Sequence, residues 1–168
     1  MTTNGSLDVY ENPIDKHEYI ITVDVSRGLA QDYSAFVVID ITHAPWRLVA
    51  KYRDKDVRPM LFPNIIYNVA TNYNKAYVLT EVNDIGEAVA GSLFYDLEYE
   101  NTLMCAMRGR AGQIVGQGFS GNKTQMGVKM SKTVKAQGCS NLKTLIEDDK
   151  LLVKDYNIVS ELTTFIQN

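Results

Sequence analysis

The run HEYIITVD, residues 17–24, decides the fold, because its apolar residues form a strand that ends in a carboxylate, Asp24. A second run, AYVLTE at residues 76–81, ends in the same way at Glu81. A carboxylate at the end of a buried strand lies at the rim of a sheet, where substrate can reach it. Mg²⁺ and Mn²⁺ prefer carboxylate and water ligands. The two runs predict a divalent-metal site with Asp24 and Glu81 as metal ligands and catalytic residues.

The alternative reading is that each acid ends its strand only because the chain turns into solvent there. The shared context favours a site, since a short polar loop follows each acid, at residues 26–28 and 83–86. Asp32, which lies past the first loop, is a possible outer-shell acid of the site. For Asp32 taken alone, a simple turn residue is the favoured interpretation.

Composition predicts one globular domain. The chain has 168 residues, of which 45% are hydrophobic and 22% charged, and this suits a single substantial core. No apolar stretch approaches the roughly 20 residues needed to cross a bilayer, and the polar start is no signal peptide. We therefore expect a soluble, intracellular protein without a membrane partner. Cys105 and Cys139 stand far apart and predict buried thiols in place of a zinc site.

Positive charge is concentrated in one segment of this otherwise acidic chain. Residues 101–146 contain no acid, although the formal net charge of the protein is -3. Lysine and arginine bind nucleic acid by displacing condensed counterions, so the segment is either a DNA-binding surface or a solvated basic loop. Beside a metal site, the first reading predicts a nuclease that holds a polyanionic nucleic acid next to its carboxylates. Its basic residues are Arg108, Arg110, Lys123, Lys129, Lys132, Lys135 and Lys143, and all but the last are our candidate DNA-binding residues.

The order of elements predicts an α/β fold with a mixed sheet. Residues 1–16 are polar and are expected to form an N-terminal arm or linker, and 17–168 the domain itself. Three strands at 19–25, 35–41 and 46–52 form an antiparallel meander, and parallel strands then alternate with helices that flank the sheet. This order fits a ribonuclease-H-like fold, in which the strands that carry Asp24 and Glu81 lie side by side. The later elements are helices at 59–74 and 85–99, strands at 76–81, 102–107 and 151–154, a loop or hairpin at 109–121, a helix within 131–148 with Leu142, Leu145 and Ile146 facing inward, and a final helix at 158–166.

Two other kinds of site are less well supported. The stretch 116–124 nearly matches a phosphate-binding Walker A loop, but Asn122 separates the glycine from the lysine that must follow it directly. Catalysis by a Ser-His-Asp triad would need one of only two histidines, His17 and His43, and neither lies in a nucleophile-elbow context. We interpret both histidines as surface residues.

Several motifs together resemble the nuclease domain of the large terminase subunit of T-even-like tailed bacteriophages, from about His17 onward. The motifs are ITVDVSRG at 21–28, QDY at 31–33, TEVN at 80–83, Gly86, VAGSL at 89–93 and KAQGCSNLK at 135–143. The resemblance implies a ribonuclease-H-like endonuclease that cuts concatemeric phage DNA, with Asp24 and Glu81 as the first two catalytic ligands of Mg²⁺ or Mn²⁺. It also implies action in the host cell cytoplasm, with the packaging ATPase domain, the small terminase subunit and the portal as partners.

This chain departs from the family pattern in two places. It has no intact Walker A sequence, so it resembles the nuclease portion alone. The family's third catalytic aspartate follows a segment similar to residues 161–165, and this chain ends at Asn168, so we expect a domain without its C-terminal end. If the protein itself ends there, we expect weak metal binding and strongly reduced cleavage, because two carboxylates hold two divalent ions poorly. The alternative function is a noncatalytic DNA-binding or docking module of a packaging complex.

Overall fold

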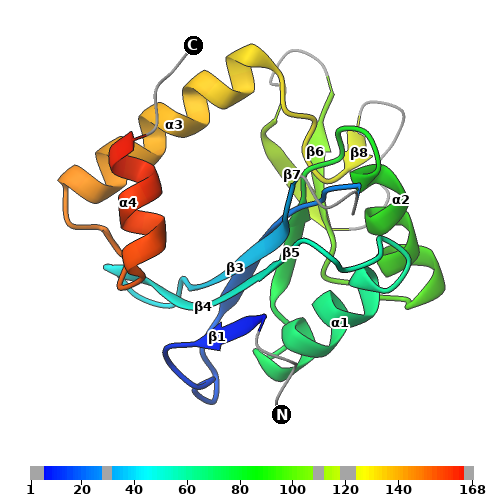
Figure 1. Ribbon diagram of the computed structural model, residues 1–168, viewed down its shortest axis with the longest axis horizontal. Helices are drawn as coiled ribbons and strands as arrows, with labels where there is room; N and C mark the ends of the chain where they lie inside the picture. Colours follow the sequence, from blue (N-terminus) through cyan, green and yellow to red (C-terminus); the bar gives the residue numbers. More distant parts are fainter. Residues whose placement is uncertain (1–5, 28–31, 108–111, 118–123, 165–168) are drawn as a thin grey trace.

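The protein is built on a mixed sheet with helices on both of its faces (Figure 1). The computed structural model describes residues 6–27, 32–107, 112–117 and 124–164. The elements in chain order are β1 (Leu7–Val9), β2 (Tyr19–Asp24), β3 (Ser34–Asp40), β4 (Trp46–Asp54), α1 (Phe62–Asn72), β5 (Tyr77–Thr80), α2 (Gly86–Gly91), the π-helical turn η1 (Ser92–Asp96), β6 (Leu103–Ala106), β7 (Ile114–Gln117), β8 (Thr124–Met126), α3 (Lys132–Glu147), β9 (Leu151–Leu152) and α4 (Tyr156–Thr164).

The predicted meander followed by a parallel strand is confirmed. The main sheet has the order β1-β4-β3-β2-β5, and β9 pairs with β4. Strands β2, β3 and β4 are antiparallel to their neighbours in the meander, whereas β5 returns through α1 and pairs parallel to β2. A parallel partner needs such a crossover, because its chain must return to the same end of the sheet. The crossover places the ends of β2 and β5 together.

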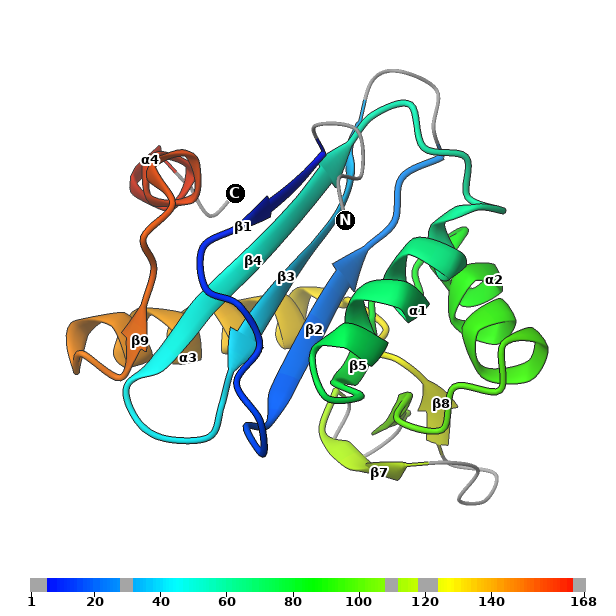
Figure 2. The same cartoon turned by 90° about the horizontal axis from the view of Figure 1, so that it is seen from below.

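One face of the sheet packs against α1, α2 and η1 to form the core. The alternation of β2 is responsible: Tyr19, Ile21 and Val23 are buried, the residues between them are half-buried, and Asp24 is exposed. Side chains of α1 meet them, with the ring of Phe62 stacked near Phe36. Helices α3 and α4 lie on the opposite side of the sheet (Figure 1 and Figure 2), and α3 contacts the sheet at β9.

Residues 7–9, which we expected to belong to an arm or linker, form the edge strand β1. It pairs antiparallel with β4, with Leu7 opposite Tyr52. Further along, the backbone amide of Tyr10 donates to the carbonyl of Val49 over 2.8 Å. The strand has only three residues and its hydrogen-bonding partner is more than forty residues away, so its own sequence is too short to indicate a strand.

The expectation that Leu142, Leu145 and Ile146 of α3 face inward holds only in part, because Leu142 and Leu145 are half-buried and Ile146 is exposed. None of the residues of α3 is buried, and Ile146 is 38% exposed. The helix packs beside the short strand β9 and not across the sheet. Its apolar stripe is therefore covered in part and does not belong to the main core.

The glycine-rich stretch was expected to be a loop or hairpin, and part of it forms a small second sheet. Strand β6 lies between β7 and β8 and is antiparallel to both. Residues 118–121 lie outside the described part of the chain. In the part of the chain that the structure describes, no helix is long and apolar enough to cross a membrane.

Candidate active site

Asp24 and Glu81 lie side by side at the end of the sheet. Strands β2 and β5 are in parallel register, with Val23 opposite Thr80, so the next residue on each strand is an acid. The backbone amide of Glu81 donates to the carbonyl of Val23 over 2.8 Å, which continues the ladder to the acids themselves. Paired residues on parallel strands point to the same face, and neighbouring strands are about 4.8 Å apart. The register therefore brings the two carboxylates together on one face.

Glu81 is held from its other side by the segment at residues 127–130. The amide of Val128 donates to the carbonyl of Thr80 over 2.8 Å, and the amide of Val82 donates to the carbonyl of Val128 over 2.9 Å. The side chain of Asn83 then binds both backbone groups of Met130, at 2.9 Å and 2.7 Å. Glu81 thus sits between two strand-like neighbours, and its backbone position is fixed from both sides.

Two glycines permit this close packing. A Cβ atom on Gly127, whose φ is +74°, would lie 2.1 Å from the carbonyl oxygen of Thr80. A Cβ atom on Gly86, at the start of α2, would lie 1.9 Å from the carbonyl oxygen of Glu81. Both contacts are far closer than any side chain allows. The motif TEVN followed by Gly86 is thus explained by the approach of α2 to the backbone of the second acid.

The environment of the acid pair raises the pKa of both carboxyl groups. Burial is the main cause for each, because it disfavours the charged form. The charge of Asp32 raises the pKa of Asp24 further, and the charge of Asp24 does the same to Glu81. Lys135 opposes this at Glu81. The site therefore concentrates negative charge that a bound cation would neutralise.

A hollow of about 370 Å³ opens over the two acids. Its floor is the apolar second face of the sheet, and the segment before α3 forms one wall. The lining residues other than the acids are Thr22, Val23, Ala35, Phe36, Val37, Leu79, Val128 and Met130. The carboxylates thus lie in an accessible depression, and the packed helices α1 and α2 cover the other face of the sheet.

The donor chemistry of the pair fits a hard divalent cation. Two adjacent carboxylates supply oxygen ligands, and Mg²⁺ commonly binds through one or two carboxylates while keeping several waters. Asp32 lies near enough for its charge to act on Asp24, and its backbone carbonyl accepts a hydrogen bond from the Ser26 hydroxyl over 2.9 Å. Within the ranges that the structure describes, no three His, Cys, Asp or Glu side chains form a metal-binding group.

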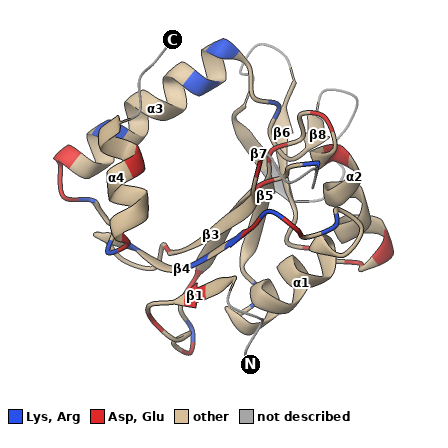
Figure 3. Cartoon of the chain, in the orientation of Figure 1, with Lys and Arg blue, Asp and Glu red and all other residues tan. Residues whose placement is uncertain are grey.

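The basic residues are placed only in part. Lys132 and Lys135 lie in the first turn of α3 and are exposed, and Figure 3 shows this charge at the end of the helix nearest the small sheet. Lys135 is close enough to lower the pKa of Glu81, so this end of α3 faces the acid pair. Lys129 lines a second hollow, of about 350 Å³, beside the loop that follows Glu81. Arg108, Arg110 and Lys123 lie outside the described residues.

Sequence reasoning missed one contact beside the acids. Arg27, three residues after Asp24, pairs through two nitrogens with the carboxylate of Asp84, three residues after Glu81. Asp84 does not cap the following helix: the cap residue of α2 is Ile85, and no side chain caps it. The equal spacing of Arg27 and Asp84 from the two acids was the available signal, since aligned strand ends bring equivalent loop positions together.

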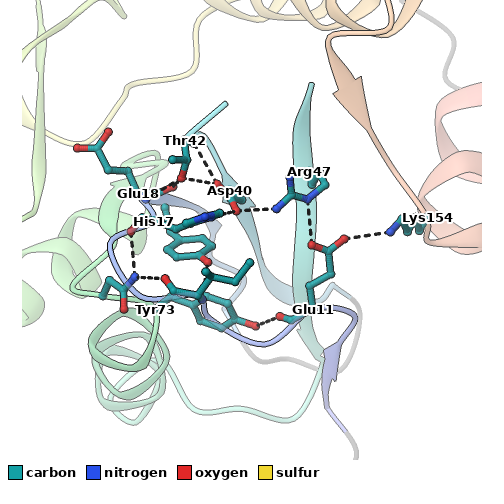
Figure 4. Close-up of polar contacts among 11 residues, drawn as sticks. Glu11, His17, Glu18, Asp40, Thr42, Arg47, Tyr73 and Lys154 are labelled. Carbon is teal, nitrogen blue, oxygen red and sulfur yellow. Dashed lines mark hydrogen bonds and ion pairs between the residues drawn. The ribbon is translucent and has the colours of Figure 1, made fainter. Parts of the chain in front are cut away.

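A second polar cluster lies at the opposite end of β2 and is built for stability (Figure 4). Asp40 accepts from His17 at 2.7 Å, from Arg47 at 2.9 Å and from Thr42 at 2.6 Å. Arg47 also binds Glu11, which is paired with Lys154. Each side chain of the cluster contacts another side chain of the cluster, and Asp40 is only 2% exposed. These contacts give Asp40 a structural role.

Asp155 likewise has a structural position. It is 6% exposed, binds the Lys51 ammonium over 2.5 Å and accepts a hydrogen bond from the Tyr10 hydroxyl. Its other oxygen accepts from the amide of Ile158 over 2.8 Å and so caps α4. Lys51 is on β4, two strands away from β2, so Asp155 does not join the acid pair.

The chain matches a known family of domains and is similar in fold to solved structures. Residues 21–168 match the family of terminase RNaseH-like domains. The large terminase nuclease of the thermophilic phage G20c with bound zinc is similar with a TM-score of 0.70 and 24% identity, over 98% of this chain and 80% of that one. The cobalt-bound structure of the same nuclease has a TM-score of 0.68 and 26% identity, over 98% of this chain and 72% of that one. The large terminase nuclease domain of Thermus phage P74-26 has a TM-score of 0.66 and 26% identity, over 99% of this chain and 72% of that one. The predicted ribonuclease-H-like fold is thereby confirmed.

Proposed function

Because the chain belongs to the family of terminase RNaseH-like domains, we propose that it is a divalent-metal-dependent endonuclease domain that cuts double-stranded phage DNA during genome packaging. The observation that carries the proposal is the parallel register of β2 and β5, which sets Asp24 beside Glu81 over an open hollow. The narrower likeness to T-even-like phages stays a prediction.

In this proposal Asp24 and Glu81 hold the cation through their carboxylate oxygens. The cation, Mg²⁺ or Mn²⁺, would supply an activated water and stabilise the leaving oxygen of the phosphodiester. Structures of the G20c nuclease with magnesium, cobalt and zinc support a divalent ion. Asp32 is the outer-shell acid of the proposal, and its charge increases the need for a cation at Asp24.

The lysines near the acids would bind the DNA backbone. Lys132 and Lys135 project from the first turn of α3, and Lys129 lies just before that helix. Contacts from lysine to phosphate carry no base information, so we expect little sequence preference in cutting. Arg108, Arg110 and Lys123 belong to the same proposed surface by sequence. The proposal also places the domain in the cytoplasm of the infected host, with the packaging ATPase domain, the small terminase subunit and the portal as partners.

The test is nicking of supercoiled plasmid with Mg²⁺ or Mn²⁺. We expect Asp24→Asn and Glu81→Gln to abolish nicking while circular dichroism stays unchanged. Glu18→Gln is the matched control, because Glu18 is an exposed acid at the other end of β2. A thermal-shift titration supplies a readout that does not depend on cutting: Mn²⁺ should raise the melting temperature of the wild-type and Glu18→Gln proteins more than that of Asp24→Asn. Nicking by Asp24→Asn would remove Asp24 from the proposal.

A noncatalytic DNA-binding module is the second candidate. It is favoured because, among the described residues, no three His, Cys, Asp or Glu side chains are grouped closely enough to hold a metal ion. A DNA affinity that depends on salt and is unaffected by chelator, without any nicking, would support the binding module.

A further inference from the structure

An ion pair between Arg27 and Asp84 joins the loops that follow the two acids. Nη2 of Arg27 lies 2.7 Å from Oδ1 of Asp84, and Nε contacts Oδ2 of the same carboxylate. The pair is exposed, with 64% of the Arg27 side chain and 53% of the Asp84 side chain accessible. It therefore stands in solvent beside the entrance to the acid pair.

Fold stability does not explain this contact well. Exposed ion pairs add little to stability, because water and salt screen them and two side chains must be ordered. Asp84 also has a φ of +55°, a backbone conformation that few side chains adopt, although aspartate tolerates it better than most. Asp84 thus adopts an unfavourable backbone conformation while its contact with Arg27 adds little to stability.

The geometry of the pair is suited to a different acceptor. Two nitrogens of a guanidinium bind a phosphate in the same two-point manner as a carboxylate. A DNA strand that reaches Asp24 and Glu81 brings a row of phosphates past the loop that carries Arg27. Asp84 and Lys129 line the same hollow of about 350 Å³. A carboxylate released by Arg27 therefore has the ammonium group of Lys129 beside the same hollow.

We propose that Arg27 is a phosphate-binding residue of this site and that Asp84 is its placeholder, which a backbone phosphate of DNA displaces. This inference rests on the proposed function, because it requires DNA at the acid pair. In the absence of DNA, the placeholder keeps Arg27 extended and masks its charge. Asp84 consequently lowers the affinity for DNA, and Arg27 raises it.

The test measures binding of a short fluorescent DNA duplex by anisotropy in EDTA, at several salt concentrations. Arg27→Gln should weaken binding about fivefold to tenfold and reduce the salt slope by roughly one unit, since one phosphate contact is lost. Asp84→Asn should strengthen binding, and the double variant should match Arg27→Gln. Lys150→Gln is the control, because it removes one positive charge and an exposed ion pair, with Asp148, elsewhere.

Opposite signs for the two single variants distinguish a placeholder from a structural tie. If the pair only joins the loops, Arg27→Gln and Asp84→Asn change the affinity in the same direction or not at all, and this overturns the inference. Plasmid nicking by the wild-type chain distinguishes failure of the placeholder inference from failure of the proposed function. A chain that nicks DNA while both variants bind alike contradicts the placeholder alone, whereas a chain that neither binds nor nicks contradicts the proposed function as well.

Discussion

Asn83 and Met130 are joined by two hydrogen bonds between the side-chain amide of the first and the backbone of the second, at 2.9 Å and 2.7 Å. The contact connects the loop after Glu81 to the residue that precedes the first turn of α3. That turn carries Lys132 and Lys135. Asn83 thus fixes the backbone near Glu81 relative to the turn that carries the two lysines. A change at Asn83 should affect the position of both.

We expect Asn83→Ala to lower the free energy of unfolding by about 1–2 kcal/mol, because two hydrogen bonds are lost and Met130 keeps its backbone groups unpaired. DNA affinity should fall as well, since the start of α3 is no longer fixed beside Glu81. Urea unfolding and anisotropy measure the two effects. Asn101→Ala is the control: its amide donates to the carbonyl of Lys75 over 2.6 Å, away from the acids. It should lose stability without losing DNA affinity, and equal affinity loss in both variants would argue against a specific role of Asn83.

The two glycines of α2 give a sharper comparison. Gly86→Ala would place its Cβ against the carbonyl oxygen of Glu81, whereas a Cβ on Gly91 meets nothing within 4 Å. We expect Gly86→Ala to displace the backbone of the second acid and abolish the Mn²⁺-dependent rise in melting temperature. Gly91→Ala should stabilise the helix by up to about 1 kcal/mol and leave the metal response unchanged. A normal metal response in Gly86→Ala would contradict the close packing that we describe.

The buried pair of Lys51 and Asp155 predicts how stability depends on pH. Burial alone would raise the pKa of Asp155, but hydrogen bonds from Lys51 and Tyr10 outweigh it and hold the pKa at about 2. An unfolded aspartate has a pKa of about 3.9. The pair therefore contributes its full stability above about pH 4, and this contribution is lost as the pH falls toward 2. Urea unfolding of the wild type and Asp155→Asn should show a shallower pH dependence for the variant over this window.

Removing the Lys51 ammonium group alone should lower the free energy of unfolding more than Asp155→Asn does. Lys51→Met leaves the carboxylate of Asp155 buried without its ion-pair partner, which costs about 3–5 kcal/mol. The same unfolding measurement checks it at pH 7. The variant with both Lys51→Met and Asp155→Asn should recover part of the loss. A double variant no more stable than Lys51→Met alone would show that the uncompensated charge is not the cause.

The fold and the acid pair were predictable because their signals are local or follow from strand order. The alternation in residues 19–24 and the apolar run before Glu81 indicate strands by themselves, and a crossover helix between them forces parallel pairing. Aligned strand ends then bring Asp24 and Glu81 together without any knowledge of side-chain contacts.

The remaining features depend on partners that are distant in the sequence. β1 is a strand only because β4 offers it an edge, and Asn83 meets Met130 across 47 residues. The error at α3 has a different origin. Periodicity identifies the apolar stripe of Leu142 and Leu145, but it does not reveal whether another element covers that stripe. Arg27 and Asp84 were visible as charged loop residues, and only the register of the two strands shows that they meet.

The most direct measurement of the central claim is an anomalous diffraction map from crystals of this chain soaked in Mn²⁺. The account predicts a peak between the carboxylates of Asp24 and Glu81, within coordinating distance of both, and no such peak in Asp24→Asn crystals. A map without density there at saturating Mn²⁺, or with the ion held by other residues, would contradict it.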